Sequence, residues 1–586
     1  MSKRTIKVQA NGYNGKIDFD IAVNGNHIDD INVTKSSETP AIFKQTFSKL
    51  KNEIIAKQSF AVDAVSGASV MTQAVLDAGK KALKKNNITP DAKNDAGIHR
   101  DVVLNVDVAV IDSGIAGLMA AARALSMGKS VLVLEKNGYL GGATILNGSN
   151  VVATASKVAE KLFGKESEKD SSALLVSDIT RESGASNYAQ LSELLANNIG
   201  KAVDFIAEFA GLTYQKAETQ TVEHTVKRQI ELPAGSYELI TKVARAFEEK
   251  GGKILLNARV EKLNKNSDGK LISLVAEGKG QTTKVKFKSL VLSAGGWGAK
   301  MYQEHKSNIL YYGPMTSTGD YFDFAKNMNL VTRNLDWYKV YPHGLEVKPG
   351  IAKLTTYSTK KATDMGAIFV NKSGKRIVNE SAPYTHFRDA IAAQKDKVAF
   401  VVMDQKIWKQ FYALLLKYNF NKEEIQSFFA LDGKKSPILV KGDLQTVAQK
   451  AGIDYKTLKE TMDNYNEDVE AGYDPEFGRP AKFMHAYEGN TYYVIEQKLR
   501  FCTTLGGYVT NNRMQLLDKS IKPVANFFAA GEVIGGANGR DPMPSMMNSW
   551  AYASGFVAGT EAADNCNFYP VEQQEEVDAL SGASEE

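Results

Sequence analysis

Apolar and polar residues alternate along the first part of the chain, the pattern of half-buried strands. Three such segments, TIKVQA, KIDFDIAV and HIDDINVT, are separated by NG or GN turn signals. Two segments of helical period follow, FKQTFSKLKNEII and MTQAVLDAGKKALKKN. Residues 1–90 are therefore predicted to form a small α+β domain, and the polar stretch 91–102 is predicted to be a linker.

A different pattern begins at residue 103. VLNVDVAVI predicts a buried strand, DSGIAG a turn, LMAAARALSMG a helix and KSVLVLEK a second strand. The turn of this βαβ unit would match the dinucleotide fingerprint GxGxxG, but Asp112 stands at the first glycine position. Gly114 and Gly117 fill the other two, and Glu135 ends the second strand, where an acid can bind a ribose hydroxyl. A purely structural strand–turn–helix is the alternative interpretation of this turn.

Later apolar strands also end in small residues. A glycine-rich loop, GYLGGATILNGSNVVA, follows Glu135, and KILLNARV at 253–260 predicts one further strand. SLVLSAGGWG and NFFAAGEVIGG each read as a strand that runs into a glycine turn. Such strand ends converge on one nucleotide-sized crevice in a doubly wound sheet. The α/β sheet is thus expected from two segments, 103–339 and 499–570.

Between these segments, residues 340–498 are rich in Lys, Tyr and Phe. Their period is largely helical, as in VAFVVMDQKIWKQFYALLLKY at 398–418 and in YKTLKETMDNYNEDVEAG. We interpret this stretch as an inserted α+β lid domain. The acidic residues 571–586 are predicted to form a flexible tail.

Composition narrows the function. The 586 residues are too many for one core, and 72 basic residues face 67 acidic ones without a basic run, so no nucleic-acid partner is expected. MSKRTIKVQANGYNG lacks the apolar region of a secretory signal, and no apolar run is long enough for a membrane span. Two cysteines can hold neither an iron–sulfur cluster nor a c-type haem. Electron transfer would then use organic cofactors, no metal is expected, and a cytoplasmic location fits.

Six segments carry a family resemblance. In order they are DSGIAGLMAAARAL, GGATILNG, STGDYFDFAKNMNL, GAIFVNKSGKRIVNE, TTLGG and AAGEVIGG. On the basis of these six segments, residues 103–570 resemble the flavoprotein subunit of soluble fumarate reductases of the flavocytochrome c type. That family includes urocanate and acrylate-type reductases. Residues 1–90 resemble FMN-binding domains with the motif D-x-x-[ST]-G-A-[ST]. The resemblance implies a doubly wound FAD-binding domain with an inserted lid, non-covalent FAD and a second flavin.

The motifs and the resemblance together assign a set of residues to FAD. They are Ser113, Gly114, Ala116, Gly117, Glu135, Lys136, Gly141, Gly142, Ala143, Thr144, Gly148, Val260, Ala294, Gly295, Gly296, Asp320, Gly531, Glu532, Asn548 and Ser549.

The string DAVSGAS at 63–69 matches the FMN motif and recurs as DALSGAS at 578–584, with six of seven positions identical. In the FMN-binding family a flavin transferase joins the last hydroxyl to the flavin phosphate, which implies covalent FMN on Ser69. Ser66 or Ser69 acting as a helix cap is the structural alternative. The second string is either a further attachment site, on Ser584, or a coincidence.

The resemblance also implies the reaction. Reduced FAD gives a hydride from N5 to one alkene carbon, and a lid arginine protonates the other carbon. Arg388 in GKRIVNESAPYTHFRD is the candidate for that arginine, and Arg376 is its rival. The substrate is expected to contact Tyr341, His343, Thr503, Arg540 and Asn548.

The substrate positions depart from those of fumarate enzymes. Where that family has its second arginine, this chain has Pro544, followed by Met546, Met547 and Trp550. An apolar wall suits an aromatic or alkyl group better than a second carboxylate. We therefore expect a 2-enoate with one carboxylate, such as cinnamate or urocanate, with fumarate second. Simple core packing is the alternative role of these side chains.

Two other functions remain open. Ketosteroid dehydrogenases share the FAD and lid arrangement, and a flavin-loaded electron carrier would need no Arg388. The donor is equally open between NADH acting at the FMN and a partner reductase.

Overall fold

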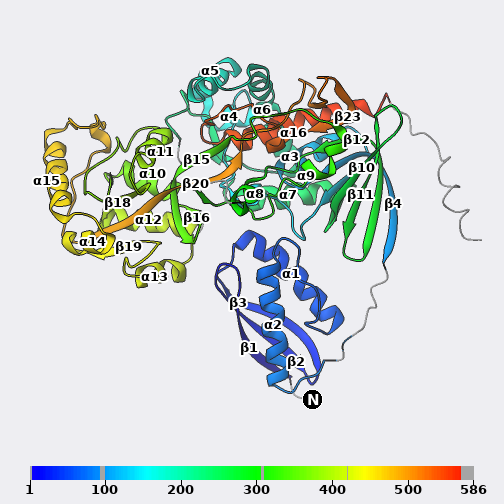
Figure 1. Cartoon of the computed structure of the whole chain (residues 1–586), viewed down its shortest axis with the longest axis horizontal. Coiled ribbons are helices and arrows are strands. Elements are labelled where there is room, and N and C mark those ends of the chain that lie inside the picture. The colour runs from blue at the N-terminus through cyan, green and yellow to red at the C-terminus, as the bar shows by residue number, and fades with distance from the viewer. Residues whose placement is uncertain are drawn as a thin grey trace, which may run out of the picture.

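The computed structural model describes residues 3–90, 92, 99–218, 220–304, 309–418 and 420–568. These residues form five sheets, of which the two largest have eight and seven strands and the N-terminal one has three. In Figure 1 the three-stranded sheet and its helices lie below, the seven-stranded sheet lies to the left, and the eight-stranded sheet lies to the right. This arrangement confirms the predicted fold class, a doubly wound sheet with an α+β lid and a small N-terminal α+β domain.

The N-terminal sheet follows the alternating pattern of its sequence. Its antiparallel strands are β1 (Lys3–Asn11), β2 (Lys16–Asn24) and β3 (His27–Ser36), and its helices are α1 (Pro40–Lys57) and α2 (Ser69–Lys85). Ile17, Phe19 and Ile21 alternate with polar residues along β2, and each is at most 1% exposed. Their side chains form a core with the apolar faces of the two helices.

The eight-stranded sheet is mainly parallel near its centre. Its strands are β4 (Arg100–Ile111), β5 (Val131–Glu135), β9 (Lys253–Leu256), β10 (Arg259–Lys265), β11 (Leu271–Gly278), β12 (Gln281–Leu292), β22 (Gln515–Leu517) and β23 (Pro523–Ala529). Strands β9, β5, β4, β12 and β23 pair in parallel in that order. Their carboxyl ends therefore lie along one edge, where α/β sheets bind ligands.

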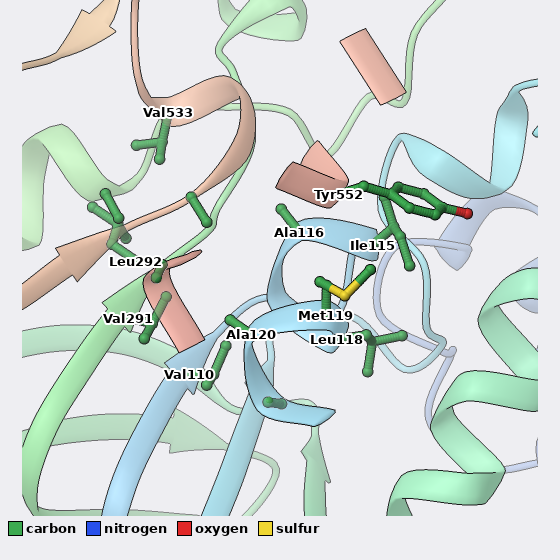
Figure 2. Close-up of a cluster of buried hydrophobic side chains, with 14 of the residues drawn as sticks. Val110, Ile115, Ala116, Leu118, Met119, Ala120, Val291, Leu292, Val533 and Tyr552 are labelled. Atoms are coloured by element: carbon green, nitrogen blue, oxygen red, sulfur yellow. The ribbon is translucent and has the colours of Figure 1, made fainter. Parts of the chain in front are cut away.

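Helix α3 (Ile115–Ser126) follows β4 and packs against both the sheet and α16 (Met546–Asn565), which also contacts the sheet. Figure 2 shows apolar side chains of this helix, with Ala120 next to Val110 of the sheet. The two helices approach closely because Gly555 and Gly559 lack side chains: a Cβ there would lie 2.5 and 2.4 Å from carbonyl oxygens of α3. This contact fixes the start of α3 relative to the start of α16.

The seven-stranded sheet forms the centre of the lid. Its strands are β13 (Leu310–Tyr311), β15 (Tyr338–Lys348), β16 (Ile351–Leu354), β17 (Ile368–Val370), β18 (Val398–Asp404), β19 (Leu439–Gly442) and β20 (Tyr492–Thr504). Its helices are α10 (Thr356–Asp364), α11 (Tyr384–Ala392), α12 (Gln405–Tyr418), α13 (Lys422–Ala430), α14 (Leu444–Ala451) and α15 (Tyr455–Ala471). Strand β20 ends beside the FAD-binding part of the chain, since Thr504 bonds to Glu532 there.

Two sequence predictions are wrong in detail. The single strand expected at 253–260 is two strands, because Asn257 has a φ of +55° and its N–H donates to the Asn137 carbonyl. The helical period assigned to 398–418 covers a buried strand, β18, followed by helix α12. The apolar β-branched run VAFVVM fits a strand buried on both faces, which periodicity alone does not separate from a helix.

Candidate active site

Two adjoining cavities open at the carboxyl ends of the parallel strands, and Asp112 lines both. The first cavity extends between the FAD-binding part and the lid, and the second lies beside the ends of β5 and β10. The residues expected to hold FAD divide between them. Gly114, Ala116, Ala143, Thr144, Gly148, Gly295, Gly531, Glu532 and Asn548 line the first cavity, and Glu135, Lys136, Val260, Ala294 and Asp320 line the second.

The other residues assigned to FAD lie behind these linings. They are Ser113, Gly117, Gly141, Gly142, Gly296 and Ser549. Gly117 lets α3 approach β4, since a Cβ there would lie 2.2 Å from the Asp112 carbonyl oxygen. Gly296 similarly gives room to Glu532, whose carboxylate would be 2.1 Å from an added Cβ. These two glycines shape the site because they leave room for neighbouring groups.

The turn between β4 and α3 adopts the required bend although it carries an aspartate. Asp112 has a φ of +86°, a region that glycine enters more easily. Its Oδ1 accepts the Gly114 N–H at 2.7 Å, and Gly114 is the N-cap of α3. Gly114, Ile115 and Ala116 line the first cavity, so the positive end of α3 faces it.

Glu135 is 1% exposed and joins the end of β5 to the turn before α3. Its carboxylate accepts from Ser113 N–H and Oγ at 3.1 and 2.5 Å and from Asn137 N–H at 2.7 Å. Burial, together with the charge of Asp112, raises the pKa of Glu135 to about 8. Beside it, Lys136 bonds to Asp320 at 2.9 Å at the second cavity.

Glu532 lines the first cavity, as Asp112 does. It accepts from Thr504 N–H at 2.8 Å and from Thr504 Oγ1 at 2.9 Å. Burial raises its pKa to about 7, although these hydrogen bonds oppose the shift.

The described residues fit FAD. A helix N-terminus faces a cavity bordered by Gly148, Gly295 and Gly531, where backbone can approach a ligand closely. Acidic and lysine side chains stand at the second cavity, where ribose hydroxyls need partners.

Three of the five expected substrate residues line the first cavity: Tyr341, Thr503 and Asn548. His343 does not line it; its ring is 2% exposed and packs against Phe369, Tyr384 and Phe387. Burial lowers the pKa of His343 well below its usual range, so the ring is neutral. Arg540 is exposed, with its guanidinium 6.0 Å from the Trp337 ring centroid.

The expected apolar wall is present in part. Pro544 and Met547 line the first cavity together with Met543. Met546 and Trp550 are at most 1% exposed and pack in the core instead. Trp550 donates its ring N–H to the Gly531 carbonyl at 2.9 Å. Core packing is therefore their role, and the wall is built from the loop before α16 and from Met547 in the first turn of that helix.

The two candidate arginines have different surroundings. Arg376 is 5% exposed and bonds to Glu380 at 2.7 Å and to Asp474 at 3.0 Å. Arg388 stands on α11 outside the cavity lining and pairs with Asp389 and with Asp541, which Lys339 also contacts. Burial lowers the pKa of Arg388, but these carboxylates outweigh it and raise the pKa above its ordinary value.

Sequence reasoning missed a group of lid side chains in the first cavity. They are Tyr312, Thr356, Tyr357, Tyr384 and Arg500. Arg500 stands two residues before the CTTLGG segment, in an apolar strand, and a charged residue in a buried strand was the available signal.

The FMN motif at 63–69 contacts the FAD-binding part directly. Ser66 donates to the Lys136 carbonyl at 3.2 Å and accepts from Gly138 N–H at 3.0 Å. Gln45 of α1 bonds to both backbone groups of Leu140, and Asp63 lies 3.2 Å from Lys279. Ser69 is exposed and is the first residue of α2. The second string, with Ser584, lies outside the described residues.

The described residues include neither a metal-binding cluster nor a membrane-spanning helix. No three His, Cys, Asp or Glu side chains among them are grouped to bind a metal ion. None of their helices has the length and apolar character that a membrane span needs.

The known proteins to which this chain is similar include several reductases. Urocanate reductase of Eggerthella lenta is 27% identical over 577 residues, which cover 94% of this chain and 91% of that protein. NADH:fumarate oxidoreductase of Klebsiella pneumoniae is 25% identical, over 93% of this chain and 57% of that protein. A flavocytochrome c3 fumarate reductase in an open conformation superposes with a TM-score of 0.62, at 25% identity and 79% coverage of both chains.

A 3-ketosteroid Δ1-dehydrogenase from Sterolibacterium denitrificans shares the fold at 19% identity, with a TM-score of 0.64 over 78% of this chain and 99% of that one. Residues 12–84 match the FMN-binding domain family, and residues 107–547 match the FAD binding domain family. Residues 107–547 make up more than half of this chain, so the chain belongs to the FAD binding domain family of oxidoreductases and carries an FMN-binding domain before it.

Proposed function

We propose that this protein reduces the C=C bond of a 2-enoate that has one carboxylate and an aromatic or alkyl substituent. The lining of the first cavity carries this proposal. Met543, Pro544 and Met547 supply apolar surface, and Arg500 is the single cation among the described lining residues. A dicarboxylate would leave one carboxylate against apolar surface, at a cost of several kcal/mol. The names of relatives that act on urocanate, fumarate and acrylate support the same reaction class.

Bound FAD supplies the hydride in this reaction. The chain's own residues form the walls that exclude water, and one of them supplies the proton. Arg388 is our candidate for the proton donor, because it lies one helical turn after Tyr384, which lines the cavity. A guanidinium with a raised pKa donates only if a nearby acid returns the proton. Asp541 is in contact with Arg388 and is 24% exposed, so it can exchange protons with solvent.

Electrons reach FAD, on this proposal, through FMN attached covalently to Ser69 by a flavin transferase. Ser69 is exposed and Val70 beside it is 57% exposed, so a transferase can reach the hydroxyl. The electron donor is either NADH or a partner reductase, and Ser584 is a second attachment site on the same motif.

The test is steady-state reduction by FAD-loaded full-length protein with a dithionite-reduced dye. Cinnamate, urocanate, acrylate, crotonate and fumarate form the substrate panel. An aromatic enoate should give the highest kcat/KM, and fumarate clearly less. Fumarate ranking first would overturn the assignment of a single carboxylate, and no turnover of any enoate would overturn the reaction class.

Arg388→Ala tests the proton donor in the same assay. Loss of general acid help costs about 10²–10⁴-fold in rate, while FAD content and FAD reduction by the donor should stay intact. Arg388→Lys should recover part of the rate, since an ammonium can donate but lacks the guanidinium's planar contacts. Arg245→Ala, at an exposed helix position paired with Glu249, is the matched control and should change nothing. Full activity in Arg388→Ala would remove Arg388 from the mechanism.

A further inference from the structure

Arg500 is a buried cation in the cavity wall, and no acidic side chain among the described residues pairs with it. Its side chain belongs to β20, and the residue is 3% exposed. Nε donates to the His343 carbonyl at 3.1 Å, and Nη2 donates to Thr356 Oγ1 at 2.7 Å. Nη1 is buried and has no hydrogen-bond partner among the described residues.

Other buried arginines of the chain are neutralised. Arg228 has Asp170 and Asp178, Arg376 has Glu380 and Asp474, and Arg479 has Glu380, all within 3.2 Å. No ion pair joins Arg500 to a carboxylate in the part of the chain that the structure describes. A buried charge without a counter-ion costs several kcal/mol, so the missing anion is expected from a ligand.

Two aromatic rings hold the guanidinium in the cavity wall. It lies 4.1 Å from the Tyr312 ring centroid and 4.8 Å from that of Tyr341. Both tyrosines line the first cavity, as Arg500 itself does. Stacking on aromatic faces fixes the plane of a guanidinium while its N–H groups remain free to meet a carboxylate. The site is therefore built for an anion before the ligand arrives.

The other candidate anchors are unsuited to this role. Arg540 is exposed and directed to Trp337, His343 is enclosed by aromatic rings, and Pro544 offers no donor. We propose that Arg500 binds the carboxylate of the enoate, with Nη1 as the donor that the free protein leaves unused. This inference rests on the proposed function, which it extends by naming the residue that selects a monocarboxylate. The anchor then stands on the lid strand β20 and not on the loop before α16.

The experiment compares an acid with its uncharged isostere. Cinnamate and cinnamamide are reduced by wild-type, Arg500→Met and Arg500→Lys proteins, each loaded with FAD. Loss of a hydrogen bond to a charged group weakens binding by about 10- to 100-fold, so KM for cinnamate should rise by that factor in Arg500→Met. KM for cinnamamide should change little, and Arg500→Lys should be intermediate for cinnamate. Arg513→Met, which removes an exposed arginine paired with Glu561, should match the wild type.

Binding without turnover gives a second readout. Titration of oxidised protein with 3-phenylpropionate should shift the flavin absorption in the wild type and in Arg500→Lys, but not in Arg500→Met. Equal losses for the acid and the amide, an unchanged KM for cinnamate, or release of FAD from both variants would overturn the anchor. A wild-type protein that binds 3-phenylpropionate but reduces no enoate would overturn the proposed function and leave the anchor standing.

Discussion

Asp112 occupies the position where a nucleotide-binding turn ordinarily has glycine. Its φ of +86° strains any residue with a side chain. Its carboxylate also takes the Gly114 N–H, a group that such turns offer to a pyrophosphate. Burial raises the pKa of Asp112, as expected where a negative charge is unfavourable.

Asp112→Gly should therefore leave FAD affinity equal or tighter. The substitution relieves the backbone, frees one N–H and removes a carboxylate beside the pyrophosphate. Quenching of FAD fluorescence on titration of apoprotein measures the Kd. Gly117→Ala is the comparison within the same turn and should weaken FAD binding, since its Cβ would lie 2.2 Å from the Asp112 oxygen. Weaker FAD binding in Asp112→Gly would assign Asp112 a positive role.

The raised pKa of Glu135 has a consequence for stability. Its pKa is about 8 in the folded protein against an ordinary value of 4.5. Between these values the folded protein holds a proton that the unfolded chain has released. The stabilisation of the folded protein by protonated Glu135 is therefore complete below about pH 4.5. It is lost as the pH rises through about 8.

Glu135→Gln should flatten this dependence. The melting temperature of wild-type protein should fall more steeply between about pH 5 and about pH 8 than that of the variant. The slope is the readout, because an amide changes the hydrogen bonds to Ser113 and Asn137 at every pH. Parallel curves for the two proteins would show that Glu135 ionises normally.

Among the elements, the apolar pattern predicted most helices and strands correctly and misassigned one buried strand. Helices α1, α2 and α3 and strands β4 and β5 stand where the pattern expects them. The pattern does not distinguish strand β18 from a helix, because both faces of the strand are buried and the alternation is absent. The break at Asn257 depends on a hydrogen bond to Asn137, far away in the sequence.

The sequence likewise predicts one part of the candidate site and not the other. Glycine turns after strands carry a local signal, so most residues assigned to FAD do line the two cavities. Tyr312, Tyr357, Tyr384 and Arg500 come from separate lid elements and meet only in the folded protein. A tyrosine in a strand or helix has the same sequence pattern whether it faces a core or a cavity. Their positions in the sequence therefore do not predict that these side chains meet in one cavity.

Helix α2 begins at the proposed flavin attachment site. Its N-cap is Ala68, and no side chain caps the helix. Ser69 is exposed, so its hydroxyl is not needed for the fold. The positive end of the helix also suits a phosphate next to Ser69.

Ser69→Ala should therefore remove a covalent flavin without unfolding the domain. Intact mass after expression with a flavin transferase should lose one FMN, while FAD and activity with small dyes remain. Ser48→Ala, at an exposed position of α1 outside the motif, is the control and should keep its flavin. Colourless denatured wild-type protein from such a host would rule out covalent attachment altogether. A second FMN that disappears in Ser584→Ala would identify the other string as an attachment site.

At the scale of the whole molecule, the chain joins a flavin-bearing domain, a nucleotide-binding sheet and a lid (Figure 1). Residues 136–142 lie where the first two meet. Lys136 borders the second cavity, and Gly142 lies beside Asp112 of the nucleotide turn. The same loop receives Ser66 and Gln45 of the N-terminal domain.

Residues 136–142 border both the FAD site and the N-terminal domain, so they couple FAD binding to the docking of that domain. If FAD holds residues 136–142 in the form that the N-terminal domain contacts, each event lowers the free energy of the other. Thermodynamic reciprocity makes the two effects equal: docking of the FMN domain tightens FAD binding by the factor by which FAD tightens docking. Loss of FAD would then release the N-terminal domain as well, so the two flavins would enter and leave their electron-transfer arrangement together.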